Sequence, residues 1–99
     1  MHRQEVIRNI QAIAPALRAA GVLHLWLFGS VARDEADEHS DVDCGIDLTP
    51  EATPGFTLLD RSHISILLED ALGLPVDVLV RADMRNVRAD FERDAIQVF

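Results

Sequence analysis

The chain has 99 residues, 48% of them hydrophobic, which predicts one small globular domain spanning residues 1–99. Seventeen acidic residues against nine basic ones, all arginine, give a net charge of −8 at pH 7, which disfavours direct nucleic-acid binding because phosphate binding needs a positive surface. No apolar run approaches the ~20 residues of a membrane span, and the N-terminus has no signal-peptide segment, so we expect a cytoplasmic protein without a membrane partner.

The first part of the chain predicts a helix, a strand and a short helix in turn. Apolar residues recur at three- and four-residue steps over residues 4–19, which predicts a helix that Pro15 kinks or shortens. The apolar run 23–28 predicts a buried strand. A short helix is expected from Ser30 to Ala36, followed by a polar loop over residues 37–40.

Residues 41–48 alternate between polar and apolar side chains, which predicts a strand with one apolar face. The apolar face would carry Val42, Cys44, Ile46 and Leu48, and the other face Asp41, Asp43, Gly45 and Asp47. Asp47 lies about 13 Å beyond Asp43 along such a strand, so we expect it to be solvated and separate from Asp41 and Asp43.

The rest of the chain predicts a helix, a strand and a final helix. Residues 56–72 form the helix, which Gly73 and Pro75 end. Residues 76–80 form a third strand. Residues 84–97 form a last helix, whose apolar stripe consists of Met84, Val87, Phe91, Ala95 and Val98. Helices and strands therefore alternate, which predicts an α/β or α+β domain with a three-stranded sheet covered by helices.

The pair Gly29-Ser30 stands at a predicted strand-to-helix junction. Glycine lets the backbone approach a ligand closely, and the first turn of a helix offers free N–H groups. With the hydroxyl of Ser30, these features suit a phosphate group. Most Gly-Ser pairs are ordinary turns, so the pair alone leaves that alternative open.

Asp41 and Asp43 are two residues apart on a predicted strand, so their carboxylates point to the same side. Neighbouring carboxylates repel each other unless a cation joins them, and Mg²⁺ prefers carboxylate, water and phosphate oxygen. A solvated strand start is the alternative.

Asp77 interrupts the apolar run Val-Asp-Val-Leu-Val. It could lie at a sheet edge, pair with an arginine, or stand beside Asp41 and Asp43 on a neighbouring strand. In the last arrangement three carboxylates could hold two metal ions ~3.5–4 Å apart, the spacing used in phosphoryl displacement.

The segment Gly29-Ser30-Val31-Ala32-Arg33, with Ser40-Asp41-Val42-Asp43 after it, resembles the G-S-x-A-R…S-D-x-D signature of minimal nucleotidyltransferases in the DNA polymerase β superfamily. The sequence around Asp77 is similar to that of the third family carboxylate. The resemblance covers nearly the whole chain. It implies the nucleotidyltransferase fold, with a small mixed three-stranded sheet covered by about four helices.

The resemblance also implies a role for each matching residue. Gly29 and Ser30 would hold the β- and γ-phosphates of ATP. Asp41 and Asp43 would ligate Mg²⁺, with two ions expected. Asp77 would complete the metal site and take the proton from the attacking hydroxyl.

Arg33 matches the signature arginine, which in such a site lies near the phosphates or braces the loop. An ion pair with Asp34 or Glu35 is the alternative. Asp34 departs from the family pattern, since many members have glycine there, and Gly45 and Asp47 interrupt a stretch that is usually apolar.

Single-domain members of this kind resemble antitoxins that are paired with HEPN-domain RNase toxins. The resemblance implies a stable complex with a HEPN toxin and transfer of AMP from ATP to a hydroxyl of that toxin, commonly a tyrosine. The negative charge of the chain suits a basic, RNA-binding partner. Two alternatives remain: a non-catalytic antitoxin that acts by binding alone, and a small-molecule nucleotidyltransferase.

Overall fold

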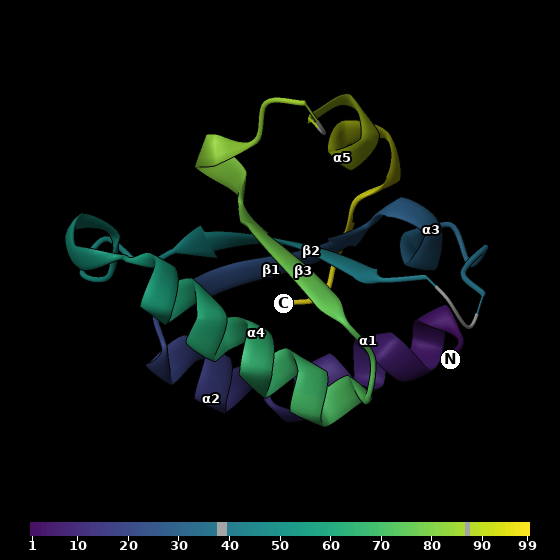
Figure 1. Ribbon diagram of the computed structural model, residues 1–99, viewed down its shortest axis with the longest axis horizontal. Coiled ribbons are helices and arrows are strands. Elements are labelled where there is room, and N and C mark those ends of the chain that lie inside the picture. Colours follow the sequence, from purple (N-terminus) through teal and green to yellow (C-terminus); the bar gives the residue numbers. More distant parts are fainter. Residues whose placement is uncertain (38–39, 87) are drawn as a thin grey trace.

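The computed structural model describes residues 1–37, 40–86 and 88–99 and contains one mixed four-stranded sheet (Figure 1). The elements in chain order are α1 (Arg3–Ala12), α2 (Ala14–Ala19), β1 (Val22–Phe28), α3 (Gly29–Ala32), β2 (Val42–Leu48), the 3₁₀ turn η1 (Thr53–Gly55), α4 (Leu58–Leu72), β3 (Val76–Val80), the 3₁₀ turn η2 (Arg81–Asp83), α5 (Arg88–Asp94) and β4 (Ile96–Gln97). The strand order is β3-β2-β1-β4. β1 is antiparallel to β2 and β4, whereas β2 and β3 are parallel.

Helices α1, α2 and α4 cover one face of the sheet, and α5 lies over the other (Figure 1). The main core fills the space between the sheet and the three helices. Its side chains with no exposed surface are Val6, Ile10, Leu17, Val22, Leu25, Leu27, Val42, Cys44, Ile46, Ile64 and Leu68. A second, smaller cluster of Phe28, Met84 and Phe91 lies between the sheet and α5. The α/β class predicted from the sequence is therefore confirmed.

The helix predicted over residues 4–19 is broken at Ile13, which separates α1 from α2. Pro15 lies in the first turn of α2, where its missing N–H costs no helical hydrogen bond. The predicted effect of Pro15 is thus confirmed.

The prediction of a single helix over residues 84–97 is wrong, and so is the count of three strands. Helix α5 occupies the middle of this segment and ends at Asp94, after which β4 pairs with β1. The N–H of Leu25 donates to the carbonyl of Phe99 at 3.1 Å, and the N–H of Val98 donates to the carbonyl of Leu25 at 2.8 Å. The end of the chain thereby satisfies backbone groups that β1 would otherwise leave open at a sheet edge.

The apolar stripe that suggested one long helix serves two cores. Phe91 joins the small cluster under α5, whereas Val98 is buried in the main core. Residue Val87, also part of the predicted stripe, lies outside the described residues.

Helix α3 is shorter than the predicted Ser30–Ala36, because it ends at Ala32 and Asp34 takes a left-handed φ of 59°. Aspartate tolerates this conformation better than most side chains. Of the predicted polar loop, Glu38 and His39 lie outside the described residues.

Helix α4 begins two residues later than predicted because Thr57 caps it. The Thr57 hydroxyl accepts a hydrogen bond from the N–H of Asp60 at 3.3 Å, and the Asp60 carboxylate accepts one from the N–H of Thr57 at 2.9 Å. This reciprocal capping box fixes the helix start. Gly73, with φ 69°, ends the helix as predicted.

Gly45 is buried in the middle of β2 because the small cluster packs directly on it. A Cβ at this position would lie 2.7 Å from Cε of Met84 and 2.7 Å from Cε2 of Phe91. The departure from the apolar family pattern at Gly45 therefore makes room for α5 on this face of the sheet.

Asp47 is not simply solvated, so that prediction is wrong. Its carboxylate accepts a hydrogen bond from Nε of Arg81 at 2.9 Å and forms an ion pair with Nη2 of Arg81 at 2.8 Å, and its side chain is 22% exposed. The Arg81 guanidinium also lies over the ring of Trp26, 4.6 Å from its centroid. Asp47 thus helps to fix the far end of the sheet face.

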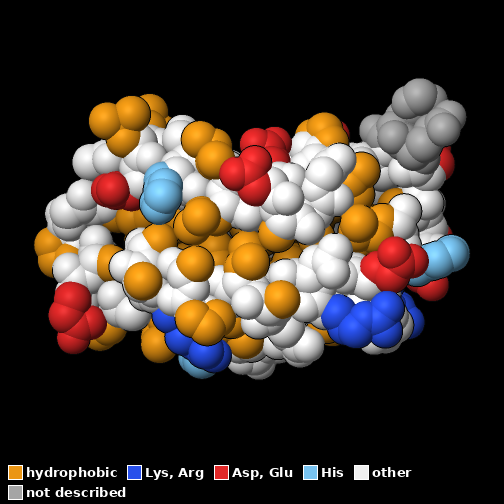
Figure 2. All heavy atoms as spheres, turned by 90° about the horizontal axis from the view of Figure 1, so that it is seen from below, with side chains coloured by type: hydrophobic (Ala, Val, Ile, Leu, Met, Phe, Trp, Pro, Cys, Tyr) orange, Lys and Arg blue, Asp and Glu red, His pale blue; other side chains and the backbone are white. Residues whose placement is uncertain are grey.

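The face formed by the helices carries hydrophobic side chains across its middle and charged ones mostly toward its margins (Figure 2). Among the described residues, no helix combines the length and the apolar character needed to cross a membrane. The most exposed large apolar side chains are on α4, Leu58 at 72% and Leu59 at 82%.

We expect Gly45→Ala to lower the free energy of unfolding by about 1–3 kcal/mol, because the added methyl group overpacks the cluster under α5. Urea unfolding followed by circular dichroism measures this change. Gly55→Ala is the matched control, since a Cβ there has no atom within 4 Å. Equal stability of the two variants would contradict close packing of α5 on β2.

Candidate active site

The sheet register brings the predicted site residues to one end of one face. Asp43 is the Cα partner of Phe28 on β1 and of Asp77 on β3. Partners in register point to the same side of a sheet, and neighbouring strands lie ~4.8 Å apart. The side chains of Asp43 and Asp77 are therefore neighbours on the face opposite the main core, and Asp41 directly precedes β2 on the same face.

Gly29 comes directly after β1 and lies against the Asp43 carboxylate. A Cβ at Gly29 would overlap Oδ2 of Asp43 and lie 3.3 Å from its Cγ. Gly29 also has φ 74°, a left-handed conformation that favours glycine. Both facts require glycine here, and they place the first turn of α3 beside the carboxylates.

The carboxylates disfavour one another's charge. Partial burial raises the pKa of Asp43 above its ordinary value, the negative charges of Asp77 and Asp41 raise it further, and the positive charge of Arg33 opposes them. Burial also raises the pKa of the Cys44 thiol next in the chain, so this cysteine stays protonated and unreactive. The site thus concentrates negative charge at a half-buried position, as a cation-binding site requires.

The donor set fits Mg²⁺ in chemistry, since all three candidate ligands are carboxylates. In the described part of the chain, no three His, Cys, Asp or Glu side chains are already gathered as a metal-ligand set. Binding one ion with all three aspartates would therefore require their side chains to move together.

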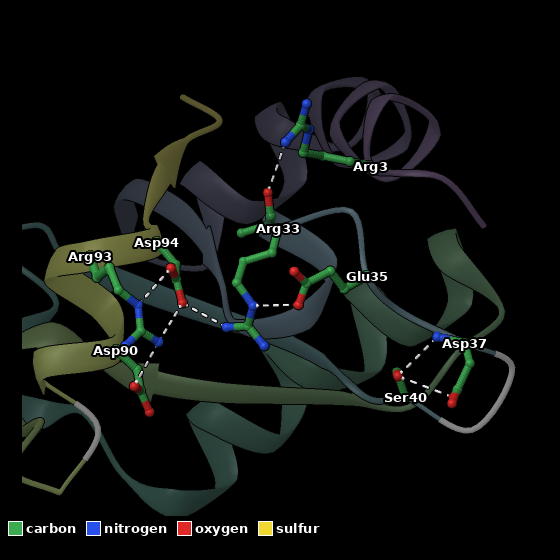
Figure 3. Close-up of polar contacts among 9 residues, drawn as sticks. Arg3, Arg33, Glu35, Asp37, Ser40, Asp90, Arg93 and Asp94 are labelled. Carbon is green, nitrogen blue, oxygen red and sulfur yellow. Dashed lines mark hydrogen bonds and ion pairs between the residues drawn. The ribbon is translucent and has the colours of Figure 1, made fainter.

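Arg33 is held by two carboxylates on different segments (Figure 3). Its Nε donates to Glu35 at 2.9 Å, and its Nη1 donates to Asp94 at the end of α5 at 2.7 Å. These hydrogen bonds raise the pKa of Arg33. A hydrogen bond from Arg93 and a weaker contribution from Arg33 lower the pKa of Asp94, so Arg33 and Asp94 both stay charged. The ion pair with Glu35 was an open alternative in the sequence, and Arg33 additionally ties α3 to α5.

Asp34 takes no part in that ion pair. Its Oδ1 accepts a hydrogen bond from the N–H of Arg3 at 3.2 Å. The guanidinium of Arg3 donates to the carbonyl of Ala32 at 2.9 Å, so the start of α1 and the end of α3 are joined (Figure 3). The left-handed φ of Asp34 accounts for the glycine that relatives are expected to have there.

Comparison with known proteins identifies the family of the chain. A family model described as "Nucleotidyltransferase domain" matches residues 8–98. The chain belongs to this family of nucleotidyltransferases. A relative from Methanocaldococcus jannaschii, named as a candidate protein adenylyltransferase, is 43% identical over 79 residues, covering 80% of this chain and 77% of the relative. Protein adenylyltransferase MntA of Thermococcus cleftensis is 38% identical over 66 residues, 67% of this chain and 63% of the relative.

Solved structures resemble this nucleotidyltransferase over nearly its whole length. A structure described as a candidate minimal nucleotidyltransferase has a TM-score of 0.78 at 31% identity, covering 97% of this chain and 95% of the other. A toxin–antitoxin structure with AMP-PNP has a TM-score of 0.68 at 17% identity, covering 100% of this chain and 73% of the other. A complex of a tri-AMPylated Shewanella oneidensis HEPN toxin with its MNT antitoxin has a TM-score of 0.65 at 19% identity, covering 92% and 69%. The last two likenesses concern the fold alone.

Asp94 is a residue of this site region that sequence reasoning missed. It lies 61 positions from Arg33 in the chain, and its side chain is only 6% exposed. The sequence around it contains several charged residues with no distinguishing pattern, so no local signal marks it as a partner of the signature arginine.

Asp43→Asn is expected to raise the melting temperature of the nucleotidyltransferase at pH 7 in Mg²⁺-free buffer. The raised pKa means that the folded state binds the Asp43 proton more tightly than the unfolded chain does. Binding of that proton stabilises the folded state at pH values below the ordinary pKa of 3.8. This stabilisation is lost as the pH rises through the folded-state pKa of Asp43. The gain from Asn therefore shrinks as the pH is lowered toward 3.8.

Thermal unfolding over this pH range measures the effect. Asp70→Asn, at an exposed position on α4, is the control and should change little. A lower melting temperature for Asp43→Asn at pH 7 would contradict the mutual repulsion of the three aspartates.

Proposed function

We propose that this nucleotidyltransferase is an Mg²⁺-dependent protein adenylyltransferase that transfers AMP from ATP to a tyrosine hydroxyl of a HEPN-type RNase toxin, and so acts as its antitoxin. The observation that carries the proposal is the register of Asp43 with Asp77, with Gly29 packed against Asp43. The names of the relatives and the AMPylated state of the toxin in one structural neighbour support the choice of acceptor.

Each site residue has one task in the proposed reaction. Gly29 and Ser30 would seat the triphosphate, because a glycine and the open first turn of α3 let phosphate oxygens approach backbone N–H groups. Asp41, Asp43 and Asp77 would hold Mg²⁺, two ions in the full site. Bound Mg²⁺ neutralises charge on the phosphates and on the oxygens that attack and leave.

The residues also define the proton path. The acceptor hydroxyl oxygen bonds to the α-phosphorus of ATP, the bond to the bridging oxygen breaks, and pyrophosphate leaves. The exposed carboxylate of Asp77 takes the proton of the hydroxyl. Asp43 is the half-buried member of the three, and its role is to position the metal and not to exchange protons with solvent.

We assign Arg33 to bracing and not to direct phosphate contact. Its guanidinium already satisfies two carboxylates, Glu35 and Asp94. If Arg33 moved to a phosphate, the nearly buried Asp94 side chain would lose one of its cationic partners. Arg33 therefore fixes the loop after α3 relative to α5 and lowers the repulsion at Asp43.

AMP transfer would block an RNase physically. Each AMP unit adds bulk and negative charge, which opposes the binding of RNA phosphates. The net charge of −8 on this chain suits a basic, RNA-binding acceptor.

The intact mass of the HEPN protein encoded in the same genome tests the proposal after incubation with this chain, Mg²⁺ and ATP. We expect a gain of one or more AMP units. Asp43→Ala should reduce the initial rate of transfer by more than about 100-fold, because electrostatic stabilisation of a phosphoryl-transfer transition state is typically worth that much. EDTA should abolish transfer.

Asp47→Asn is the matched control, since Asp47 lies on the same strand and face but away from the other acids. It should retain most of the activity. Full activity of Asp43→Ala would exclude the mechanism. A stable complex without any mass gain, still neutralising the toxin when Asp41 and Asp43 are both replaced, would identify an antitoxin that acts by binding alone. AMP transfer only to small molecules would identify a small-molecule nucleotidyltransferase.

A further inference from the structure

The outer side of β3 is open. β3 stands at the end of the strand order, and within the described residues no strand pairs with its outer side. It is five residues long, whereas the strand at the other edge, β4, has two. Natural edge strands are usually protected by charged side chains, above all lysine, by proline or by a bulge; β3 has one charged side chain, Asp77, and no lysine, proline or bulge.

The backbone pattern shows which groups are available there. The N–H of Val42 donates to the carbonyl of Pro75 at 2.9 Å, so Pro75 and every second residue after it face β2. The N–H of Val76 faces outward and donates to the Glu69 carboxylate at 3.2 Å. By the same alternation, the N–H groups of Val78 and Val80 also point to the open edge.

A groove runs along this edge, and Asp77 is the candidate-site residue that lines its first hollow. Its first hollow, of about 360 Å³, lies between α4 and β3 and is lined by residues that include Ser62, Ser65, Ile66, Asp77 and Val78. A second hollow of about 350 Å³ adjoins it at Arg61 and continues past Leu58 and Val80. A third shares Leu79 and Asp83 with the second. Figure 1 shows β3 and α4 side by side along this line.

The groove combines an apolar wall with a small excess of acidic over basic side chains. On α4, Leu58 is 72% exposed and Ile66 is 54% exposed, although both are large apolar side chains. Glu69 and Asp77 lie at one end and Asp83 at the other, while Arg61 lies where the first two hollows meet and Arg85 lines the third, so three acids face two arginines. A ligand that matches these features has main-chain N–H and C=O groups in extended form, apolar side chains and net positive charge.

We propose that the groove along β3 docks the acceptor protein, by pairing an extended, net-positive segment of it with the open edge of β3. This inference rests on the proposed function, since it names how the acceptor reaches the same site. A strand added at ~4.8 Å from β3 has side chains on the face of Asp77, directly opposite or diagonal to it. A hydroxyl side chain there comes within reach of the Asp77 carboxylate, while Gly29 and Ser30 remain free for the nucleotide on the other side of Asp43.

Val80→Pro tests the backbone pairing. Val80 has φ −74°, which proline adopts without strain, and its N–H faces away from β2. We expect the KM for the HEPN protein to rise about two- to tenfold, the effect of one lost hydrogen bond, with the Kd of Mg·ATP unchanged. Val80→Ala is the matched control, because it loses the side chain and keeps the N–H.

Ile66→Asp tests the apolar wall and should raise the same KM about tenfold. Leu23→Asp, at an apolar position on β1 that is 42% exposed, is its control and should leave the KM unchanged. Groove variants that transfer AMP with the wild-type KM would overturn the docking proposal and leave the proposed function standing.

Hydrogen–deuterium exchange gives a reading that needs neither catalysis nor a folded proline variant. In the complex of the Asp43→Ala chain with the HEPN protein, the amides of Val78 and Val80 should exchange more slowly than in the free chain. Unchanged exchange in a formed complex overturns the docking proposal. Protected amides together with a wild-type chain that transfers no AMP would support the docking site and reject the proposed function.

Discussion

The close approach of Gly29 to the Asp43 carboxylate is the contact on which the site depends. It joins the end of β1 to β2, the inner strand of the parallel pair. The contact exists only because residue 29 has no side chain and tolerates φ 74°. Through it, a backbone turn suited to phosphates and a group of carboxylates suited to a cation occupy the same place. Any Cβ at residue 29 would push Asp43 away and separate the two halves of the site.

The same arrangement is unfavourable for the folded chain without a cation. Three aspartates lie at one end of the sheet, and burial together with the charges of Asp77 and Asp41 raises the pKa of Asp43. The main core under the sheet and the capped helix α4 supply the stability that offsets this repulsion. A cation would remove the repulsion directly, so metal binding and folding stability are coupled in this site.

The sequence predicted the class of fold, the order of the six elements from the first helix to β3, and the residue types of the site. Two kinds of information were missing from the sequence: the register between strands and the packing partners of the C-terminal segment. The register that makes Asp43 and Asp77 neighbours is a tertiary property, which the alternation of side chains along one strand does not contain. The resemblance to the family supplied this neighbourhood indirectly, because it assigns all three aspartates to one site.

The prediction for the C-terminal segment was wrong for a different reason. Its apolar residues fit a helical stripe, yet they divide between two cores on opposite faces of the sheet, and the last of them pair with β1. The ion pair of Arg33 with Asp94 follows from that placement and so was equally invisible. Local periodicity cannot show that the residues of one stripe pack against different partners. The open edge of β1, with which the chain end pairs, is formed by residues 69 and 71 positions earlier.

One edge of the sheet is covered by β4 and the other is open, and each arrangement has a physical reason in a protein of this size. Closing the edge of β1 with β4 adds hydrogen bonds and buries Val98, which a thin core needs. Closing the edge of β3 in the same way would cover Asp77, whose carboxylate must meet an acceptor hydroxyl in the proposed reaction. With a nucleotide on the side of α3, as proposed, the β3 side would remain open to a large acceptor. An enzyme that modifies a protein therefore has reason to keep β3 open, and the acceptor itself can supply the missing strand.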